Sequence, residues 1–492
     1  MTAGAPVVRI GNCSGFYGDR FSALGEMLTG GELDVLTGDY LAELTMLILG
    51  RDRLKDPNTG YAKTFLRQME QHLGIALERG VKVVVNAGGL NPAGLATALR
   101  DTAGKLGLTA RIAHVEGDDL AARATELGLG SVLTANAYLG GFGIAECLRA
   151  GADVVVTGRV TDAALVLGPA VAHFGWQPTD YDRLAGAVAA GHVIECGTQA
   201  TGGNFSFFTE IAELEHAGFP IAEIAADGSA VITKHAGTGG AVTTDTVTAQ
   251  LLYEIAGVDY ANPDVTARFD TIELSAAGTD RVALSGTKGI SPPATLKVCV
   301  NSLDGHRNAA TFVLCGLDIE AKAELVRRQL LAEYSTEELT IDLARTDRPD
   351  ADTEESASAL LHVTIRASDP ARCKAFSRTA VELALASYPG FTLTAPPSAG
   401  SPVGVYRAQY VPRQHVGHVA VLPDGERVDI EDGPVATASP SAAAQHPGCA
   451  PLSGDLLTRR VPLGSVLGAR SGDKGGDANL GLWARSAQGY RW

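Results

Sequence analysis

The stretch VKVVVNAGGLNP, residues 81–92, decides the fold because it joins a strand, a turn and a helix start. Val81–Val85 is a β-branched run of the kind that forms buried strands. Asn91 suits the N-cap of a helix, and Pro92 suits its first turn. We therefore predict a strand, a glycine turn and a helix over residues 92–106.

The same alternation recurs on both sides of this stretch. Residues 6–10, 111–115 and 153–157 are further apolar, β-rich runs, and helical patterns occupy residues 61–78 and 161–174. Strands that are almost continuously apolar and alternate with helices indicate a parallel sheet covered on both faces. The predicted class is α/β, an N-terminal parallel sheet with flanking helices.

Each predicted strand ends in a polar turn that contains glycine. Ligands of open α/β sheets bind at the carboxyl ends of the strands. We therefore predict one cleft at that edge, lined by residues from four turns: Asn12, Asn86, Glu116 and Arg159.

The second half of the chain has a different pattern. A hairpin around Asp227-Gly228 is followed by a helix that ends near Ile255, and residues 295–394 show the order β-β-α-β-β-α-β. That order predicts an α+β ferredoxin-like domain, which we expect to be a scaffold or an interface. An Ala/Ser/Pro-rich stretch predicts a linker, and the last residues are too few for a core of their own. The predicted boundaries are 1–290 for the α/β core, 291–432 for the ferredoxin-like domain, 433–460 for the linker and 461–492 for the incomplete start of a C-terminal domain.

Composition excludes several classes of protein. The net charge of −16 and the pI of about 5.2 argue against nucleic-acid and anionic-membrane partners. The chain has neither an apolar run of the roughly 18 residues that a membrane helix needs nor a signal peptide at its N-terminus, so we expect a cytoplasmic protein. Its 7 cysteines are scattered without a CxxC pair, which argues against a zinc site or a disulfide framework.

The first turn, residues 11–20, is rich in glycine and in side-chain donors. It matches neither the dinucleotide fingerprint nor the P-loop. It can bind an anion near a helix start, or it can be a tight turn in which Asp19 is the N-cap. The candidate ligand-binding residues here are Asn12, Ser14, Tyr17, Asp19 and Arg20.

The next three turns carry further candidates. Asn86, Gly88 and Gly89 suit close contact between the backbone and a carbonyl or phosphate. Glu116, Asp118 and Asp119 can serve in acid/base chemistry, bind a hard cation, or cap the following helix. Arg159 can pair with an anion or simply with Asp162, and Asn136 lies just upstream.

Residues 192–204 combine His192, Glu195, Cys196 and Asn204. No oxyanion or triad signature accompanies Cys196, which favours a buried, inert thiol. Glu195 follows two apolar residues that can help to raise its pKa, so we predict an acid/base role. Asn204 is a candidate ligand-binding residue.

The loop 234–240 is the strongest candidate for an anion site. Lys234, His235, Gly237, Thr238, Gly239 and Gly240 precede a helix, and small residues expose backbone N–H groups there. His235 can also move a proton near neutral pH. The alternative is a glycine hinge between the hairpin and the helix. The similar loop 471–479 can be a hairpin turn and nothing more.

Taken together, these segments resemble the AtuA family of acyclic terpene utilisation. The strings GNCSGFYGDR, NAGGLNP, TGRVTDAALVLGP, ECGTQATGGNF, KHAGTGGAVTTDTVTAQLLYEI and ARSGDKGGDANLG carry the resemblance, which covers the chain to about Ile290 and again from Val461. It implies a role in the catabolism of acyclic terpenes or branched acids.

Those pathways use acyl-CoA thioesters, so the resemblance implies an acyl-CoA enzyme with hydratase or carbon–carbon lyase chemistry. The alternatives are a non-catalytic acyl-CoA-binding subunit and a metal-dependent hydrolase that uses the acidic turn. We expect a homo-oligomer that needs no cofactor, with Glu116, Asp118, Glu195 and His235 as the catalytic residues.

Overall fold

The computed structural model describes residues 7–436, 459–474 and 477–492. Its contacts divide the chain into a large unit, residues 1–301 with 406–492, and a small unit, residues 302–405.

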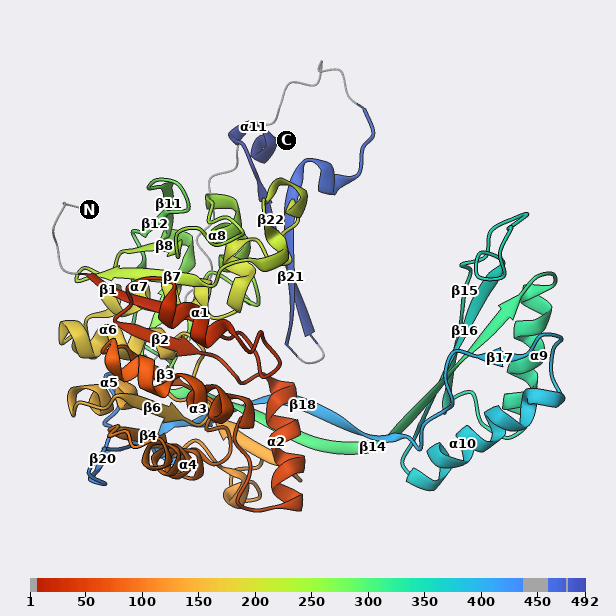
Figure 1. Cartoon of the computed structure of the whole chain (residues 1–492), viewed down its shortest axis with the longest axis horizontal. Helices are drawn as coiled ribbons and strands as arrows, with labels where there is room; N and C mark the ends of the chain where they lie inside the picture. The colour runs from red at the N-terminus through yellow and green to blue at the C-terminus, as the bar shows by residue number, and fades with distance from the viewer. Residues whose placement is uncertain (1–6, 437–458, 475–476) are drawn as a thin grey trace. The chain divides into compact units, whose positions relative to one another are not determined.

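Five parallel strands form the centre of the large unit (Figure 1), in the order β1 (Val7–Asn12), β2 (Val35–Gly38), β3 (Lys82–Val85), β6 (Val154–Thr157) and β4 (Ile112–Glu116). The α/β prediction is therefore confirmed. Sequence reasoning missed β2, whose four residues are all buried.

Antiparallel strands extend this sheet on both sides. Beyond β1 lie β7 (Pro220–Ala225), β8 (Ala230–Lys234), β12 (Val282–Ser285) and β11 (Glu273–Ala276), and beyond β4 lie β19 (Val419–Val421) and β20 (Arg427–Asp429). The predicted hairpin is β7–β8, and its turn needs glycine because Gly228 has φ +87°.

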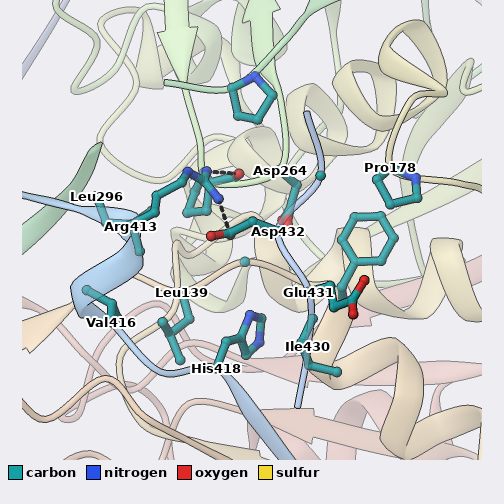
Figure 2. A pocket seen from close by; sticks show the side chains of 15 residues that line it. Leu139, Pro178, Asp264, Leu296, Arg413, Val416, His418, Ile430, Glu431 and Asp432 are labelled. Carbon is teal, nitrogen blue, oxygen red and sulfur yellow. Dashed lines mark hydrogen bonds and ion pairs between the residues drawn. The ribbon is translucent and has the colours of Figure 1, made fainter. Parts of the chain in front are cut away.

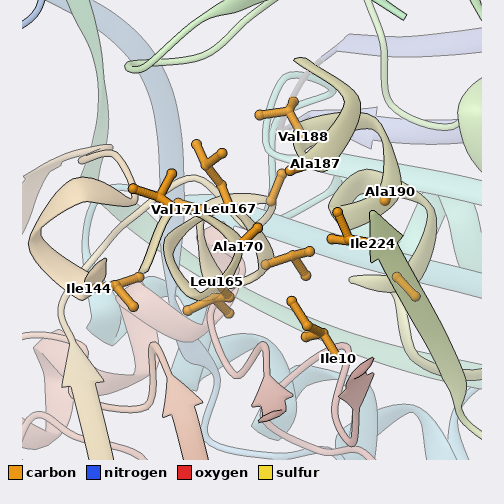
Figure 3. Close-up of a cluster of buried hydrophobic side chains, with 14 of the residues drawn as sticks. Ile10, Ile144, Leu165, Leu167, Ala170, Val171, Ala187, Val188, Ala190 and Ile224 are labelled. Atoms are coloured by element: carbon orange, nitrogen blue, oxygen red, sulfur yellow. The ribbon is translucent and has the colours of Figure 1, made fainter. Parts of the chain in front are cut away.

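Helices cover the two faces of the sheet, and two apolar cores lie beneath them. Val84 packs in the core under α5 (Phe142–Arg149), α6 (Ala164–Phe174) and α7 (Tyr181–Ile194), shown in Figure 3. Its neighbours Val83 and Val85 pack in the opposite core, under α1 (Ala23–Thr29), α3 (Lys63–Glu78) and α4 (Pro92–Lys105). A strand buried on both faces needs an unbroken apolar run, which explains Val83–Val85, whereas Lys82 before them is only half-buried and pairs with Asp153.

The predicted start of α4 is confirmed in detail. Asn91 Oδ1 accepts a hydrogen bond of 2.9 Å from Gly94 N, and Pro92 occupies the first turn. Asp19, by contrast, is not an N-cap, since α1 begins only at Ala23.

Other helices and strands also belong to the large unit. They are α2 (Glu43–Lys55), α8 (Thr244–Leu251), α11 (Ala487–Arg491), β5 (Thr134–Ala137), β9 (Asp259–Ala261), β10 (Thr266–Arg268), β13 (Lys288–Ile290), β21 (Leu467–Lys474) and β22 (Asp477–Ala484). Of the predicted linker 433–460, residues 437–458 lie outside the described part of the chain.

The small unit contains α9 (Ile319–Leu331), β15 (Leu339–Ala344), β16 (Ser358–Ala367), α10 (Pro370–Glu382) and β17 (Thr392–Leu393). Two long strands enter it from the large unit, β14 (Thr295–Cys315) and β18 (Ser401–Pro412). The two strands predicted at 297–301 and 309–314 are one strand, β14, which pairs first with β5 and then with β16.

The strand order of this second sheet is β15-β16-β14-β17, with β18 also paired to β14. The ferredoxin-like assignment stays a prediction. The unit is shorter than the predicted 291–432, because β19 and β20 belong to the large sheet.

Candidate functional site

A buried polar network lies at the carboxyl ends of the parallel strands, and Arg159 is its centre. Arg159 follows β6 and is 1% exposed. Its Nη1 donates to Leu41 O at 2.6 Å and to Asp162 Oδ1 at 3.0 Å, and its Nη2 donates to Tyr138 Oη at 3.2 Å. Arg159 Nε is buried and has no hydrogen-bond partner in the described part of the chain. A buried charged donor normally has an acceptor, so this N–H is a candidate ligand contact.

Two cationic side chains lie over the aromatic ring of Tyr138. The Arg159 guanidinium lies 4.4 Å from the ring centroid and Lys297 Nζ lies 5.1 Å from it. Tyr138 Oη in turn donates to Glu43 Oε1 at 3.3 Å. Sequence reasoning missed both Lys297 and Glu43, because neither lies in a glycine-rich turn.

Asp118 connects the ends of β4, β5 and β6. Its Oδ2 accepts hydrogen bonds of 2.8 Å from Arg159 N and 2.8 Å from Asn136 Nδ2. Burial raises the pKa of Asp118 to about 7, despite these bonds. The side chain fits because residue 158 is glycine, where a Cβ would lie 2.4 Å from Asp118 Oδ1. Asp118 can therefore gain or lose a proton near neutral pH.

Asp39, which follows β2, is a second buried carboxyl that sequence reasoning missed. Its Oδ1 accepts hydrogen bonds from Asn86 Nδ2 at 2.5 Å and from Leu41 N at 3.1 Å. Burial and the nearby Asp162 carboxylate raise the pKa of Asp39 well above its usual range. The signal in the sequence is weak, since only Val35 and Leu36 are apolar between Asp34 and Thr37.

Asn12 joins β1 to the end of α7. Its Nδ2 donates to Ile194 O at 2.7 Å and to Glu195 O at 2.9 Å. The Glu195 carboxylate lies 3.2 Å from His192 Nδ1 and acts electrostatically on Asp39. Asn12 thus positions the backbone that carries Glu195.

The thiol of Cys196 lies beside this carboxylate. Burial and Glu195 both raise its pKa well above its usual range. A thiol that stays protonated is a poor nucleophile, which favours the inert interpretation.

Glu116 is not in contact with this network among the described interactions. Its Oε1 lies 2.8 Å from His114 Nε2, and its Oε2 accepts from Arg427 Nη2 at 2.8 Å. Burial alone would raise the pKa of Glu116, but these two partners outweigh burial and lower it. The structure therefore brings Asn86, Asp118, Asn136, Arg159 and Asp162 together and gives Glu116 a structural ion pair instead.

The first turn is closed by its own hydrogen bonds. Asp19 accepts from Gly15 N at 2.8 Å and from Arg20 N at 2.7 Å, and Ser14 Oγ donates to Phe16 O at 3.0 Å. Arg20 Nη2 donates to Glu26 Oε2 at 2.7 Å, and Tyr17 packs against the core. These contacts favour a tight turn over an anion site, although Asp19 closes the turn itself and does not cap α1.

The loop 234–240 is also occupied by protein contacts. Gly240 N donates to Ala212 O at 3.1 Å, and Lys234 Nζ lies 3.2 Å from Asp280 Oδ2. His235 Nε2 lies 3.0 Å from Met27 O, and burial lowers the His235 pKa. The helix begins only at Thr244 and is capped by Thr243.

The glycines of this loop have packing roles. A Cβ at Gly239 would lie 2.0 Å from Glu213 O, whereas one at Gly237 would meet nothing within 4 Å. Thr238 Oγ1 donates to His235 O at 2.8 Å. The anion-site prediction for this loop thus gains no support here, and the hinge alternative is favoured.

Packing also explains the glycine pair after β3. A Cβ at Gly88 would lie 2.4 Å from Thr157 O, and one at Gly89 would lie 2.8 Å from Gly60 O. Asn204 has φ +55°, and its carbonyl accepts from Arg470. Close backbone packing therefore accounts for the glycines without a ligand.

Comparison with known families assigns the chain to a family. The family model "Acyclic terpene utilisation family protein AtuA" matches residues 8–422. The chain belongs to the AtuA family. Membership implies a role in acyclic terpene utilisation. The AtuA match continues past Ile290 through the small unit and ends before Val461, so its extent differs from the one expected from the strings. Comparisons with curated proteins and with solved structures found no match.

No group of three or more His, Cys, Asp or Glu residues able to hold a metal occurs in the described ranges. None of the described helices has both the length and the apolar composition to cross a membrane.

A small pocket elsewhere in the large unit is an ion-pair site (Figure 2). Its volume is about 50 Å³, which is room for a few water molecules. Arg413 Nη1 donates to Asp432 Oδ1 at 2.6 Å, and Gly141 N donates to Asp264 Oδ2 at 2.7 Å. Burial raises the Asp264 pKa to about 6. Arg413 Nε also donates to Pro293 O at 2.8 Å, which ties Arg413 to the body of the unit.

Proposed function

We propose that this AtuA-family protein is an enzyme of acyclic-terpene or branched-acid catabolism that acts on an acyl-CoA thioester. The proposed chemistry is hydration of an enoyl thioester or the related carbon–carbon cleavage. The observation that carries the proposal is the buried Arg159, whose Nε has no partner among the described residues, surrounded by carboxyls with raised pKa values.

Both reactions pass through an enolate of the thioester. A donor aimed at the carbonyl oxygen stabilises that enolate, and such a donor works best where water is excluded. Arg159 Nε–H is suited to this role because the guanidinium is held by Leu41, Asp162 and Tyr138. Those bonds hold the guanidinium in place before the substrate arrives.

Hydration also needs one group that takes a proton and one that gives a proton. Glu195 would remove a proton from water as the water oxygen bonds to the β-carbon. Asp39, protonated because burial raises its pKa, would deliver a proton to the α-carbon. In the cleavage direction the same two groups would take the proton of a hydroxyl and protonate the enolate carbon. Asp118 would keep Arg159 and Asn136 in position, because its Oδ2 accepts hydrogen bonds from Arg159 N and Asn136 Nδ2.

The test is turnover of branched enoyl-CoA thioesters and of their 3-hydroxy adducts, followed by mass spectrometry. We expect Asp39→Asn to lower turnover by roughly a hundredfold or more, the usual size of a lost acid/base group. Asp119→Asn is the matched control, because this carboxylate is partly exposed and pairs with Arg53 at 3.0 Å.

The outcomes separate the alternatives. Binding of the thioester without turnover would indicate an acyl-CoA-binding subunit. Release of free CoA that depends on an added divalent cation would indicate a hydrolase. Equal activity of the two variants would refute the role of Asp39. The homo-oligomeric state stays part of this proposal, and light scattering tests it.

A further inference from the structure

The C-terminal hairpin β21–β22 presents one specialised face to the rest of the large unit. In the pairing register, Gly468 lies opposite Trp483, Arg470 opposite Gly481, and Gly472 opposite Asn479. Residues directly opposite each other in an antiparallel pair share a face, so these six residues form one surface. The contact face is defined by Gly468, Arg470, Gly472, Asn479, Gly481 and Trp483.

The outer face is different. Leu480 is 66% exposed and Leu482 is 49% exposed. The alternation along β22 therefore separates a docked face from a solvent face, as expected for a strand that packs on one side only.

Two glycines of the contact face allow close approach to residues 252–254. A Cβ at Gly481 would lie 2.5 Å from Leu252 Cβ, and one at Gly472 would lie 2.4 Å from Glu254 Cγ. Real Cβ atoms do not come so near to a neighbour, so larger residues would push the hairpin away. Gly472 thus explains part of the motif 471–479, which the proposed function leaves unused.

The polar side chains of the face make directed contacts. Asn479 Nδ2 donates to Leu252 O at 2.7 Å, and Asn479 Oδ1 accepts from Glu254 N at 3.1 Å. The Arg470 guanidinium lies 4.3 Å from the ring centroid of Tyr253. Arg470 is only 8% exposed, so it is buried by this docking.

Arg470 also holds the loop that follows Glu195. Its Nη1 donates to Asn204 O at 3.1 Å, and its Nη2 donates to Gln199 Oε1. Trp483 stacks on Phe205, with ring centroids 6.1 Å apart. The hairpin thus contacts the loop 197–206 near its start, at Gln199, and near its end, at Asn204 and Phe205.

Hydrogen bonds within the loop support its first half better than its second half. Gly203 N donates to Thr198 O at 3.0 Å and Thr201 Oγ1 donates to Thr198 O at 2.9 Å, whereas Phe205 N donates to Gly202 O at 3.3 Å. Asn204 adopts φ +55°, a conformation that L-residues rarely choose without support. At the other end, the backbone of Cys196 packs against Gly15, where a Cβ would lie 2.7 Å from Cys196 C.

We propose that the hairpin 467–484 is an intramolecular clamp: its docked face orders the loop 197–206 and so sets the position of Glu195. Arg470 is the positioning residue of the clamp, since it alone among the described residues of the hairpin bonds both Gln199 and Asn204. The clamp lies outside the AtuA match, which ends at residue 422. The inference does not depend on acyl-CoA chemistry.

Hydrogen–deuterium exchange of the full-length protein tests the clamp. We expect Arg470→Gln to raise amide exchange within residues 197–206 by about tenfold or more, because the loop loses two charge-assisted hydrogen bonds. Gly481→Val should raise amide exchange within residues 197–206 at least as much, because the larger side chain would push the hairpin away from Leu252. Arg470→Lys should restore part of the protection, since one nitrogen replaces one of the two bonds.

Ala478→Val is the matched control, because it enlarges an exposed residue outside the contact face. It should leave exchange within 197–206 unchanged. Fluorescence of Trp483 supplies a second measure, since undocking ends its stacking on Phe205.

The clamp is refuted if Arg470→Gln and Gly481→Val leave the loop as protected as in the wild type. It is equally refuted if exchange rises only in the hairpin, or rises across the whole sheet, because then docking does not act on the loop in particular. A loop that loosens in Ala478→Val as well would also overturn it.

Discussion

Substitution of Asp118 by Asn gives a sharp test of the buried network. Asp118 is 3% exposed, and burial raises its pKa from 3.8 to about 7. The folded state therefore holds a proton on Asp118 more tightly than the unfolded state does. This contribution to stability is fully present below pH 3.8, declines as the pH rises, and is lost once the pH passes about 7.

The size of the effect follows from the shift. One pKa unit corresponds to about 1.4 kcal/mol, so between pH 5 and pH 8 the wild type should lose about 3 kcal/mol relative to Asp118→Asn. The amide keeps the shape of the side chain, and its oxygen can still accept from Arg159 N and Asn136 Nδ2. The amide has no proton to lose in this range, so the pH dependence of the free energy of unfolding that Asp118 causes is absent from Asp118→Asn.

Urea unfolding of both proteins at several pH values between 5 and 8 measures the difference. Other titrating groups contribute equally to both proteins and cancel. Asp119→Asn is the control. Its free energy of unfolding, plotted against pH, should run parallel to that of the wild type. If the free energies of unfolding of the wild type and Asp118→Asn differ by a constant amount across this pH range, the raised pKa of Asp118 and its buried state are refuted.

Three further predictions concern single positions. Gly158→Ala should lower the free energy of unfolding by about 2 kcal/mol or more, measured by thermal or urea unfolding, because the new Cβ would lie 2.4 Å from Asp118 Oδ1. Unchanged stability would contradict that geometry. Glu116→Gln should cost about 1 kcal/mol or less and leave thioester turnover nearly intact, since its partners are Arg427 and His114, whereas a large loss of turnover would restore Glu116 to the site. His362→Ala in the small unit should also leave turnover nearly intact with folding unchanged, as expected of a scaffold, and a large loss would place that unit in the catalytic machinery.

Local patterns in the sequence predicted the architecture well. The apolar run at 83–85 predicted a strand buried on both faces, and the two cores on either side of Val83–Val85 confirm this. The caps and turns at Asn91, Pro92 and Gly228 were predictable for the same reason, since each is settled within a few neighbouring residues.

The same reasoning was less complete for the candidate site. Asn86, Asp118, Asn136, Arg159 and Asp162 were predicted by their place at strand ends, and they do meet in the network. Asp39 was missed because β2 has only two apolar residues, Val35 and Leu36, before Thr37 and Gly38. Glu116 and Asp118 are two residues apart, but Gly117 with φ +114° turns the chain between them, and only Asp118 joins the network.

By itself the sequence determined the parallel α/β sheet, its caps and turns, and the membership of the AtuA family. Only the tertiary structure decided which polar groups are available to bind a ligand. In the loop 234–240, Gly240 N is satisfied by Ala212 and Lys234 by Asp280, both distant in sequence. Periodicity and capping are local properties that neighbouring residues encode, whereas the partner of a buried N–H or carboxylate depends on long-range packing.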